Sequence, residues 1–293
     1  MGCCQNIVPS IDETGLNELK SLSLDSFNEL KCIIDMTQQD VPSTAFSNLV
    51  DLSLRCVGLR EICCGGRSPT GFLENLETLK ISGCGSMSCL FPSWMLIQTL
   101  RKLKKVTVNG CGELEDVFQL EGLCYAKENH FLLSSFESLN LEYLQNMRYI
   151  WKGPTQQVSL QSLTFVYVKR CDKLRYLFTL SLARSLLQLK ELTVMDCASL
   201  EYIVEIKAEE NVAGGGGNDV LLPKLRKLQL EELENFVNFY SENSSLDMPT
   251  TKEAPQLGKE DVNMEQSPPK TTVDINCQNF DALQKRLPPY IRK

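Results

Sequence analysis

The sequence is poor in several residue types and patterns on which common functions depend. It has a single histidine, His130, so one copy of the chain cannot supply a catalytic or metal centre that needs two histidines. No run of apolar residues reaches the roughly 18–20 residues of a membrane-spanning helix. The first 30 residues hold no basic segment followed by a long apolar stretch, so no secretory signal is visible. The net charge of -7 excludes a strongly basic protein, and we expect no nucleic-acid partner.

Motifs of nucleotide binding and catalysis are also missing. The phosphate-binding pattern G-x-x-x-x-G-K-[ST] occurs nowhere, because Gly258 and Lys259 are followed by Glu260 and lack the upstream glycine. The glycine run at 214–217 is followed by Asn218 and Asp219, so we interpret residues 206–220 as a solvated loop. There is no nucleophile elbow and no metal-ligand constellation. We therefore predict a protein that is not an enzyme and uses no cofactor or metal.

What the chain does contain fits a protein with a buried core. Of its 293 residues, 43% are hydrophobic and 23% are charged, which is ordinary for a soluble protein. The thirteen cysteines are an unusual number. In a small secreted chain they would indicate a disulfide framework, but without a signal peptide a reducing compartment is the better interpretation. We expect a cytoplasmic protein.

A pattern of six apolar positions recurs through most of the chain. In the unit that starts at Leu163, apolar residues follow at steps of three, two, three, three and three. Six further units show the same steps, and one unit is a residue short after its strand. The eight units start at Leu19, Leu49, Leu76, Leu103, Phe136, Leu163, Leu189 and Leu225. The pattern L-x-x-L-x-L-x-x-[C/N/L]-x-x-L is an irregular variant of the leucine-rich-repeat signature.

This spacing predicts an α/β leucine-rich-repeat solenoid over residues 16–240. The alternation in the middle of each unit is typical of a short strand with one buried face. One such strand cannot bury its leucines alone, so we expect the strands to stack in parallel and line the concave face of a curved horseshoe. We expect the convex side to be mostly irregular or short helical. Two segments with helical spacing, 91–102 and 179–188, are the predicted helices, and Pro92 and Ser93 mark the start of the first.

Four cysteines share one position of the repeat, directly after the predicted strand. They are Cys84, Cys111, Cys171 and Cys197. A small, apolar side chain is easily buried there, and its thiol can donate a weak hydrogen bond to neighbouring backbone. We favour this structural role over a ladder of disulfides or metal ligands, because the metal alternative lacks histidines.

The two ends of the chain differ from the repeats. Residues 1–15 are either an N-terminal extension or a truncated repeat. Their start, Gly2-Cys3-Cys4, leaves acylation open, although Asn6 stands where myristoylation prefers serine or threonine. Apart from such acylation we expect no membrane contact. Residues 241–293 hold six of the twelve prolines and dense mixed charge, which predicts a disordered tail.

The outward positions of the predicted strands are free to carry function, because the core does not constrain them. Two columns are expected to line up along the concave face. One comprises Ser23, Ser53, Lys80, Thr107, Asn140, Tyr167, Thr193 and Gln229, and the next comprises Asp25, Arg55, Ser82, Asn109, Glu142, Lys169, Met195 and Glu231.

The richest exposed cluster falls on the fifth and sixth units. It comprises Tyr143, Phe165, Tyr167, Lys169 and Arg170. Tyrosine and arginine dominate binding hot spots, so this cluster is the candidate protein-binding site. The alternative is that these side chains pack on one another as a cross-strand ladder. A second, basic cluster lies at 101–105 and is either a solvated rim or a contact for an acidic domain.

The repeat subtype resembles a known family. The segments YIWKG at 149–153, VKRCDKLRYLF at 168–178 and LKELTVMDCASLEYIV at 189–204 closely resemble the C-terminal repeats of plant coiled-coil nucleotide-binding leucine-rich-repeat disease-resistance proteins. The resemblance covers roughly residues 10–240. It implies a module that recognises pathogen effectors or modified host proteins and restrains a nucleotide-binding domain.

The expected partner is therefore an effector, a guarded host protein, or the nucleotide-binding domain of a related resistance protein. Because the phosphate loop and a preceding heptad region are missing, the resemblance does not carry ATP binding over to this chain. A leucine-rich-repeat adaptor, for example in ubiquitin ligation, or a decoy or regulator unrelated to effector sensing is the alternative.

Overall fold

The structure is a computed structural model that describes residues 16–37, 44–66, 69–98, 101–123, 131–206, 221–241 and 272–276. The sequence-based expectations for residues 1–15, the acylation sites included, and for the glycine run lie outside the described residues.

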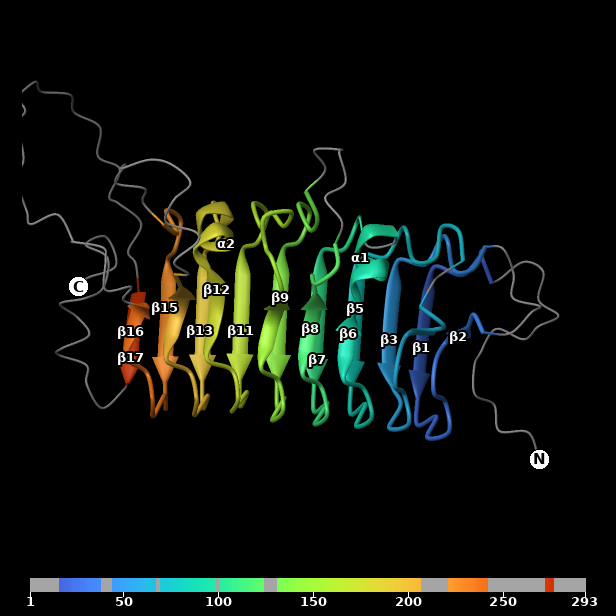
Figure 1. Ribbon diagram of the computed structural model, residues 1–293, viewed down its shortest axis with the longest axis horizontal. Helices are drawn as coiled ribbons and strands as arrows, with labels where there is room; N and C mark the ends of the chain where they lie inside the picture. Colours follow the sequence, from blue (N-terminus) through green and yellow to red (C-terminus); the bar gives the residue numbers. More distant parts are fainter. Residues whose placement is uncertain are drawn as a thin grey trace, which may run out of the picture.

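One long parallel sheet runs through the molecule. In Figure 1 its strands stand side by side in a row along the long axis, in sequence order. The nine strands are β1 (Ser21–Asp25), β3 (Asp51–Arg55), β5 (Thr78–Ser82), β7 (Lys105–Asn109), β9 (Ser138–Glu142), β11 (Phe165–Lys169), β13 (Glu191–Met195), β15 (Lys227–Glu231) and β17 (Thr272–Asn276). This confirms the leucine-rich-repeat solenoid predicted from the sequence.

The apolar steps of the repeat set the register of this sheet. Leu139 of β9 pairs with Val106 of β7 and with Val166 of β11, so equivalent repeat positions lie side by side. Leu139 and Leu141 are fully buried, whereas Asn140 between them faces the other side. Burying one leucine stabilises the fold by about 1.5–3 kcal/mol. A slip of one residue would turn both leucines outward, so the register is strongly specified.

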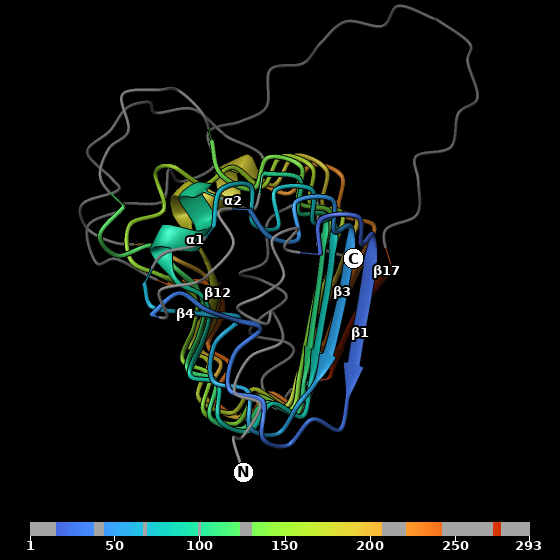
Figure 2. The same ribbon diagram turned by 90° about the vertical axis from the view of Figure 1, so that its right-hand side faces the viewer.

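A second layer of short parallel strands covers the core from the other side (Figure 2). Its members are β2 (Ile34–Asp35), β4 (Cys63–Cys64), β6 (Cys89–Phe91), β8 (Asp116–Gln119), β10 (Tyr149–Lys152), β12 (Tyr176–Thr179), β14 (Tyr202–Glu205) and β16 (Asn238–Tyr240). They form three separate sheets, β2-β4, β6-β8-β10 and β12-β14-β16. We call this layer the return side. The expectation of a mostly irregular or short helical return side thus did not foresee these short strands, which lie beside the two short helices described below.

The return strands form because every repeat but the last ends in adjacent apolar residues that are both buried. Val117 and Phe118 of β8 are examples. Phe118 stacks on Phe91 at a centroid distance of 5.0 Å and on Trp151 at 4.7 Å. Such an aromatic ladder favours repeats that stack in register, since each ring finds its partner in the next repeat.

The two predicted helices are present but shorter than expected. Helix α1 spans Ser93–Gln98 and helix α2 spans Leu180–Ser185. The preceding residues, Phe91 and Thr179, remain in return strands instead. The hydroxyl of Thr179 bonds the hydroxyl of Thr155 in the neighbouring repeat and does not cap α2. Cross-repeat bonding therefore competes with the helix start.

The repeated cysteine position has the predicted inward geometry. The thiols of Cys84, Cys111, Cys171 and Cys197 are fully buried and free. Each thiol donates to the carbonyl oxygen two residues earlier, over sulfur–oxygen distances of 3.6, 3.7, 3.5 and 3.3 Å respectively. Burial raises the pKa of Cys171 well above its usual value. These contacts confirm the proposed backbone-bonding role.

Strand β17 lies within the segment for which we predicted a disordered tail. It pairs in parallel with β15, and Val273 aligns with Leu228 and Ile275 with Leu230. Over these five residues the prediction is wrong, and the remainder of 242–293 lies outside the described residues. The sequence signal is V-x-I-x-C at 273–277, which has the spacing of L-x-L-x-C in the shortened unit at 52–56.

Candidate protein-binding face

The outward side of the nine-stranded sheet, which we call the strand face, carries the candidate site. The register pairs the residues of the first predicted column at every step from β1 to β15, and those of the second column at every step except from Arg55 to Ser82. Tyr167, for example, lies between Asn140 and Thr193, and Lys169 lies between Glu142 and Met195. The columns read from the apolar steps are therefore correct.

A further row follows the ends of the strands, and its backbone is left-handed. Tyr143, Arg170 and Asp196 have φ values of 55°, 52° and 54°. Their N–H groups donate to the last residue of the next strand, over 2.9, 3.1 and 3.1 Å. The equivalent positions in two earlier repeats are Gly83 and Gly110. The hydrogen-bond ladder thus holds non-glycine residues in a conformation that is costly for side chains.

These three side chains form a chain of contacts along the C-terminal ends of the strands, which we call the lower end. The Arg170 guanidinium lies over the Tyr143 ring, with 5.3 Å between its central carbon and the ring centroid. Arg170 Nε lies 3.6 Å from Asp196 Oδ2, and Lys169 Nζ lies 3.8 Å from the same oxygen. One carboxylate therefore faces two cations. The Arg170 side chain still exposes 56% of its surface, and Tyr143 exposes 39%.

The other two predicted residues lie higher on strand β11. The Tyr167 hydroxyl lies 4.0 Å from Met195 Sδ and is half-buried. Phe165 begins the strand, so it stands four residues before Lys169, about 13 Å away at 3.3 Å per residue. The structure therefore brings Tyr143, Lys169 and Arg170 together and leaves Phe165 at the opposite end.

Asp196 is the residue of this cluster that the sequence analysis missed. It connects Lys169 and Arg170, which lie on the preceding repeat. The available signal was its position directly after the strand, which matches that of Tyr143 and Arg170 in their own repeats.

The basic cluster at 101–105 is partly neutralised in the structure. Lys104 Nζ lies 2.9 Å from Glu77 Oε2, and this hydrogen bond raises the pKa of Lys104. Lys102 donates to the amide oxygen of Asn75. Arg101 and Lys105 are exposed. The arrangement favours the solvated-rim interpretation for Lys102 and Lys104.

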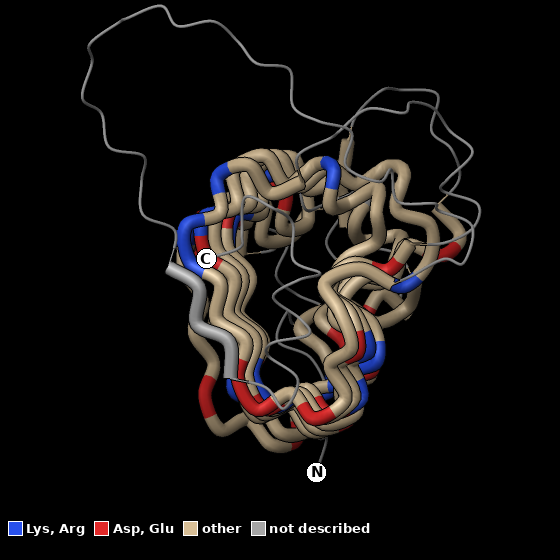
Figure 3. The backbone as a smooth tube through the Cα atoms, turned by 90° about the vertical axis from the view of Figure 1, so that its left-hand side faces the viewer, with Lys and Arg blue, Asp and Glu red and all other residues tan. Residues whose placement is uncertain are grey.

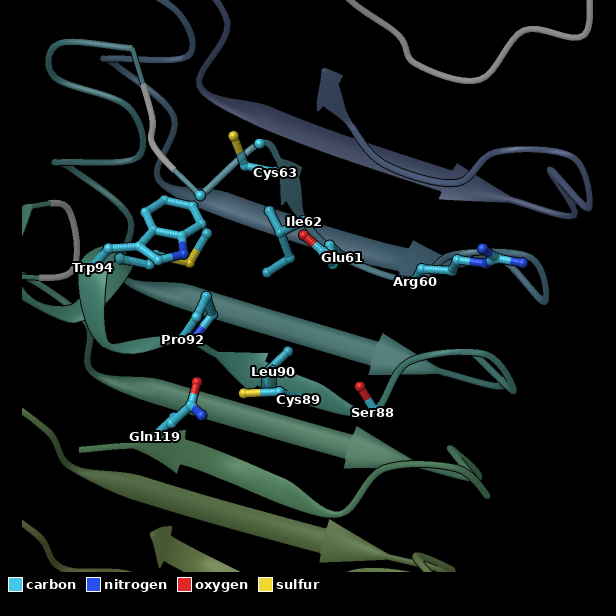
Figure 4. A pocket seen from close by; sticks show the side chains of 13 residues that line it. Arg60, Glu61, Ile62, Cys63, Ser88, Cys89, Leu90, Pro92, Trp94 and Gln119 are labelled. Atoms are coloured by element: carbon cyan, nitrogen blue, oxygen red, sulfur yellow. The ribbon is translucent and has the colours of Figure 1, made fainter. Parts of the chain in front are cut away.

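A pocket of about 380 Å³ lies on the return side, where β4 and β6 are not paired with each other. Figure 4 shows residues 60–63 along one wall, residues 88–90 along the other, and Trp94 of α1 at one end. Burial raises the pKa of Cys63 and of Cys89 to about 12, so both thiols stay protonated near neutral pH. In this state neither thiol of the pocket is an activated nucleophile.

The described residues contain no group of three or more histidine, cysteine, aspartate or glutamate side chains placed to hold a metal ion. None of the helices within them has the length and apolar character needed to cross a membrane.

The comparison with family models identifies the repeats. Residues 48–198, more than half of the chain, match the model described as "Plant disease resistance protein RPS2-like, leucine-rich repeats". A probable disease resistance protein of Arabidopsis thaliana is 28% identical over 180 residues. That match covers 60% of this chain and 18% of the relative, so the chain spans a small part of the relative's length.

Among solved structures, a leucine-rich repeat protein from Bacteroides ovatus is similar over 80% of this chain and 81% of its own, at 12% identity and a TM-score of 0.16. So low a TM-score adds nothing to the strand order and register described above. The family match, together with the eight repeats in register, shows that the chain belongs to the RPS2-like leucine-rich-repeat family of plant disease resistance proteins.

Proposed function

We propose that the chain is a protein-binding recognition or regulatory module of plant defence, and that its binding site is the cluster of Tyr143, Tyr167, Lys169, Arg170 and Asp196. The observation that carries the proposal is the exposed contact chain from Tyr143 through Arg170 to Asp196. Phe165 forms the upper margin of the site.

The chemistry of Arg170 suits recognition of a protein surface. Its guanidinium has five N–H donors in a fixed plane. Nε lies 3.6 Å from Asp196 Oδ2 and the central carbon lies over the Tyr143 ring, while 56% of the side-chain surface remains exposed. A partner's carboxylate or backbone carbonyls can accept from the guanidinium donors. Arginine and tyrosine in contact are the residue types that contribute most at protein interfaces.

The backbone supports this use because it orders the side chains before binding. The ladder bonds of Tyr143 and Arg170 fix the direction in which each side chain leaves the strand face. Side chains that are already ordered lose less conformational entropy on association, and this loss is a main cost of binding. We expect the partner to be a pathogen effector, a modified host protein, or the nucleotide-binding domain of a related resistance protein.

The test compares two matched double variants of the full chain. Tyr143→Ala with Arg170→Glu disrupts the strand-face cluster, whereas Arg148→Glu with Tyr149→Ala changes an exposed arginine–tyrosine pair on the return side. Both variants and the parent chain are used to capture proteins from host tissue, and the captured protein is then purified and its Kd measured. We expect the first variant to weaken binding about 30-fold, equivalent to roughly 2 kcal/mol at a hot spot. Unchanged binding by a folded first variant, or a loss confined to the return-side variant, contradicts the proposal.

A further inference from the structure

Charges of opposite sign are separated along the last two strands before β17. Lys190 and Arg226 precede β13 and β15, Lys227 begins β15, and all three are exposed. We call them the upper patch. Glu231 ends β15 and Glu232 follows it, on the same side as Asp196, and these three acids are the lower patch. Figure 3, viewed from this end, shows mostly blue segments at the upper end of the strand face and mostly red segments at its lower end, each with the other colour beside it.

The charges of the upper patch are not neutralised within the described part of the chain. No ion pair within 4.0 Å joins Lys190, Arg226 or Lys227 to an acid described there. Glu191 adjoins Lys227 in the register without forming such a pair. The two patches are separated by the length of one strand, about 17 Å. In the lower patch Asp196 is already paired with Lys169 and Arg170, whereas Glu231 and Glu232 form no ion pair within 4.0 Å in the described part of the chain. The three basic residues and these two glutamates therefore remain available to an outside partner.

The surface between the patches carries no charge. Thr193 is 4% exposed, while Met195 and Gln229 are half-buried. A polypeptide that covers β13 and β15 would bury only these neutral side chains in the middle of the contact. It would therefore avoid the large free-energy cost of burying an unpaired charge. The charges would stay at the margins, where they steer association and select orientation.

We propose that this end of the strand face is a self-association surface, on which a second copy of the chain docks face to face. A protein that docks here must place an acidic patch opposite the upper patch and a basic patch opposite the lower patch, at the same separation. The face itself meets that requirement when it is turned about a two-fold axis parallel to the long axis of the solenoid. That rotation reverses the strand direction and sets each upper patch against the partner's lower patch. A two-fold axis parallel to the strands would instead oppose like charges. Two-fold, self-complementary contacts are the commonest form of protein association.

The self-association surface adjoins the cluster proposed above, because Asp196 belongs to both. Docking of a second copy therefore competes with a protein partner at the cluster, and the monomer is the form that binds. The contact between copies does not depend on that partner and is measured without it.

The experiment reverses each patch separately in the full chain. One variant carries Lys190→Glu and Lys227→Glu, and the other carries Glu231→Lys and Glu232→Lys. Sedimentation velocity over a range of concentrations measures the dimer dissociation constant of the parent chain, of each variant, and of an equimolar mixture of the two. We expect the parent chain to dimerise, each variant alone to dimerise roughly 10-fold more weakly or worse, and the mixture to dimerise again. The mixture regains dimers because each reversed patch then faces an opposite charge.

Two controls separate this contact from others. Reversing exposed charges on the return side, with Glu115→Lys and Arg148→Glu, is expected to leave the dimer unchanged. Raising the ionic strength from about 0.01 M to 0.15 M shortens the screening length from roughly 30 to 8 Å and is expected to weaken the dimer. A parent chain that stays monomeric at low ionic strength overturns the proposal, even if the same face binds a different protein. A mixture that stays monomeric, or variants that dimerise like the parent chain, overturns it as well.

Discussion

Replacing Trp151 tests whether one side chain joins the two large sheets of the return side. Strands β10 and β12 belong to different sheets, so no backbone ladder connects them. Trp151 bridges this break: its indole Nε1 donates to the carbonyl oxygen of Leu177, at 3.1 Å, and its ring stacks on Phe118 with an interplanar angle of 7°. The residue is 2% exposed, so water cannot replace either contact.

The structure gives different magnitudes for two substitutions at this position. Trp151→Phe keeps an aromatic ring against Phe118 but leaves the buried carbonyl of Leu177 without its donor, which costs about 1–3 kcal/mol. Trp151→Ala removes the ring as well and leaves a cavity, for a total cost of about 3–5 kcal/mol. Because each repeat contacts only its neighbours, a weakened junction also lowers the cooperativity between the repeats on either side.

Urea unfolding of the full chain, followed by far-ultraviolet circular dichroism, measures both effects. We expect lower midpoints in the order parent, Trp151→Phe, Trp151→Ala, and a broader or two-step transition for the alanine variant. The other tryptophan supplies the matched control. Trp94 is half-buried at the pocket, and we expect Trp94→Phe to cost less than about 1 kcal/mol. A Trp151→Phe variant as stable as the parent, or a Trp94→Phe variant equally destabilised, would refute the reasoning.

Three further predictions concern pKa values and backbone conformation. Because burial raises the pKa of Cys63 and Cys89 to about 12, we expect iodoacetamide at pH 8 to leave both thiols unmodified in the folded protein, and rapid labelling detected by mass spectrometry would contradict this. The hydrogen bond from Arg175 lowers the pKa of Glu201 from its usual value. The ion pair therefore stabilises the fold at neutral pH, and this stabilisation is lost as the pH falls through the lowered pKa of Glu201. We expect Glu201→Gln to show a smaller drop in the unfolding midpoint on acidification than the parent chain. Arg170→Gly is expected to change the free energy of unfolding by less than about 1 kcal/mol, since relief of the left-handed backbone offsets the lost contacts, yet to weaken partner binding roughly 10-fold. A larger loss of stability in denaturant titrations would favour the purely structural ladder.

The strand face was predictable because its physics is local and periodic. Steps of three and two residues fix which side chains of each strand point inward, and stacking then fixes the register, so Tyr167 was placed beside Asn140 and Thr193 from sequence alone. The return strands were not predictable by the same signal. Val117 and Phe118 are both buried because both faces of β8 are covered, and the alternation that identifies a strand is then lost.

The contacts of the candidate site were only partly predictable. The residue types pointed to Tyr143 and Arg170, but their cation–π contact and the shared carboxylate of Asp196 depend on side-chain directions that the repeat does not specify. The sequence analysis also placed Phe165 in this cluster, because it considered only which aromatic residues are exposed. It did not take into account that Phe165 and Lys169 lie at opposite ends of β11.

The left-handed residues directly after the strands have a backbone role that needs no side chain. In the third and fourth repeats this position is glycine, at Gly83 and Gly110, which adopts a positive φ without strain. In the repeats that follow, the row includes Tyr143, Arg170 and Asp196 at a cost of about 1–2 kcal/mol each, although the ladder bond is made by the backbone and needs no side chain. Stability alone therefore favours glycine throughout. Part of this cost is offset by the contacts that join Tyr143 to Arg170 and Arg170 to Asp196.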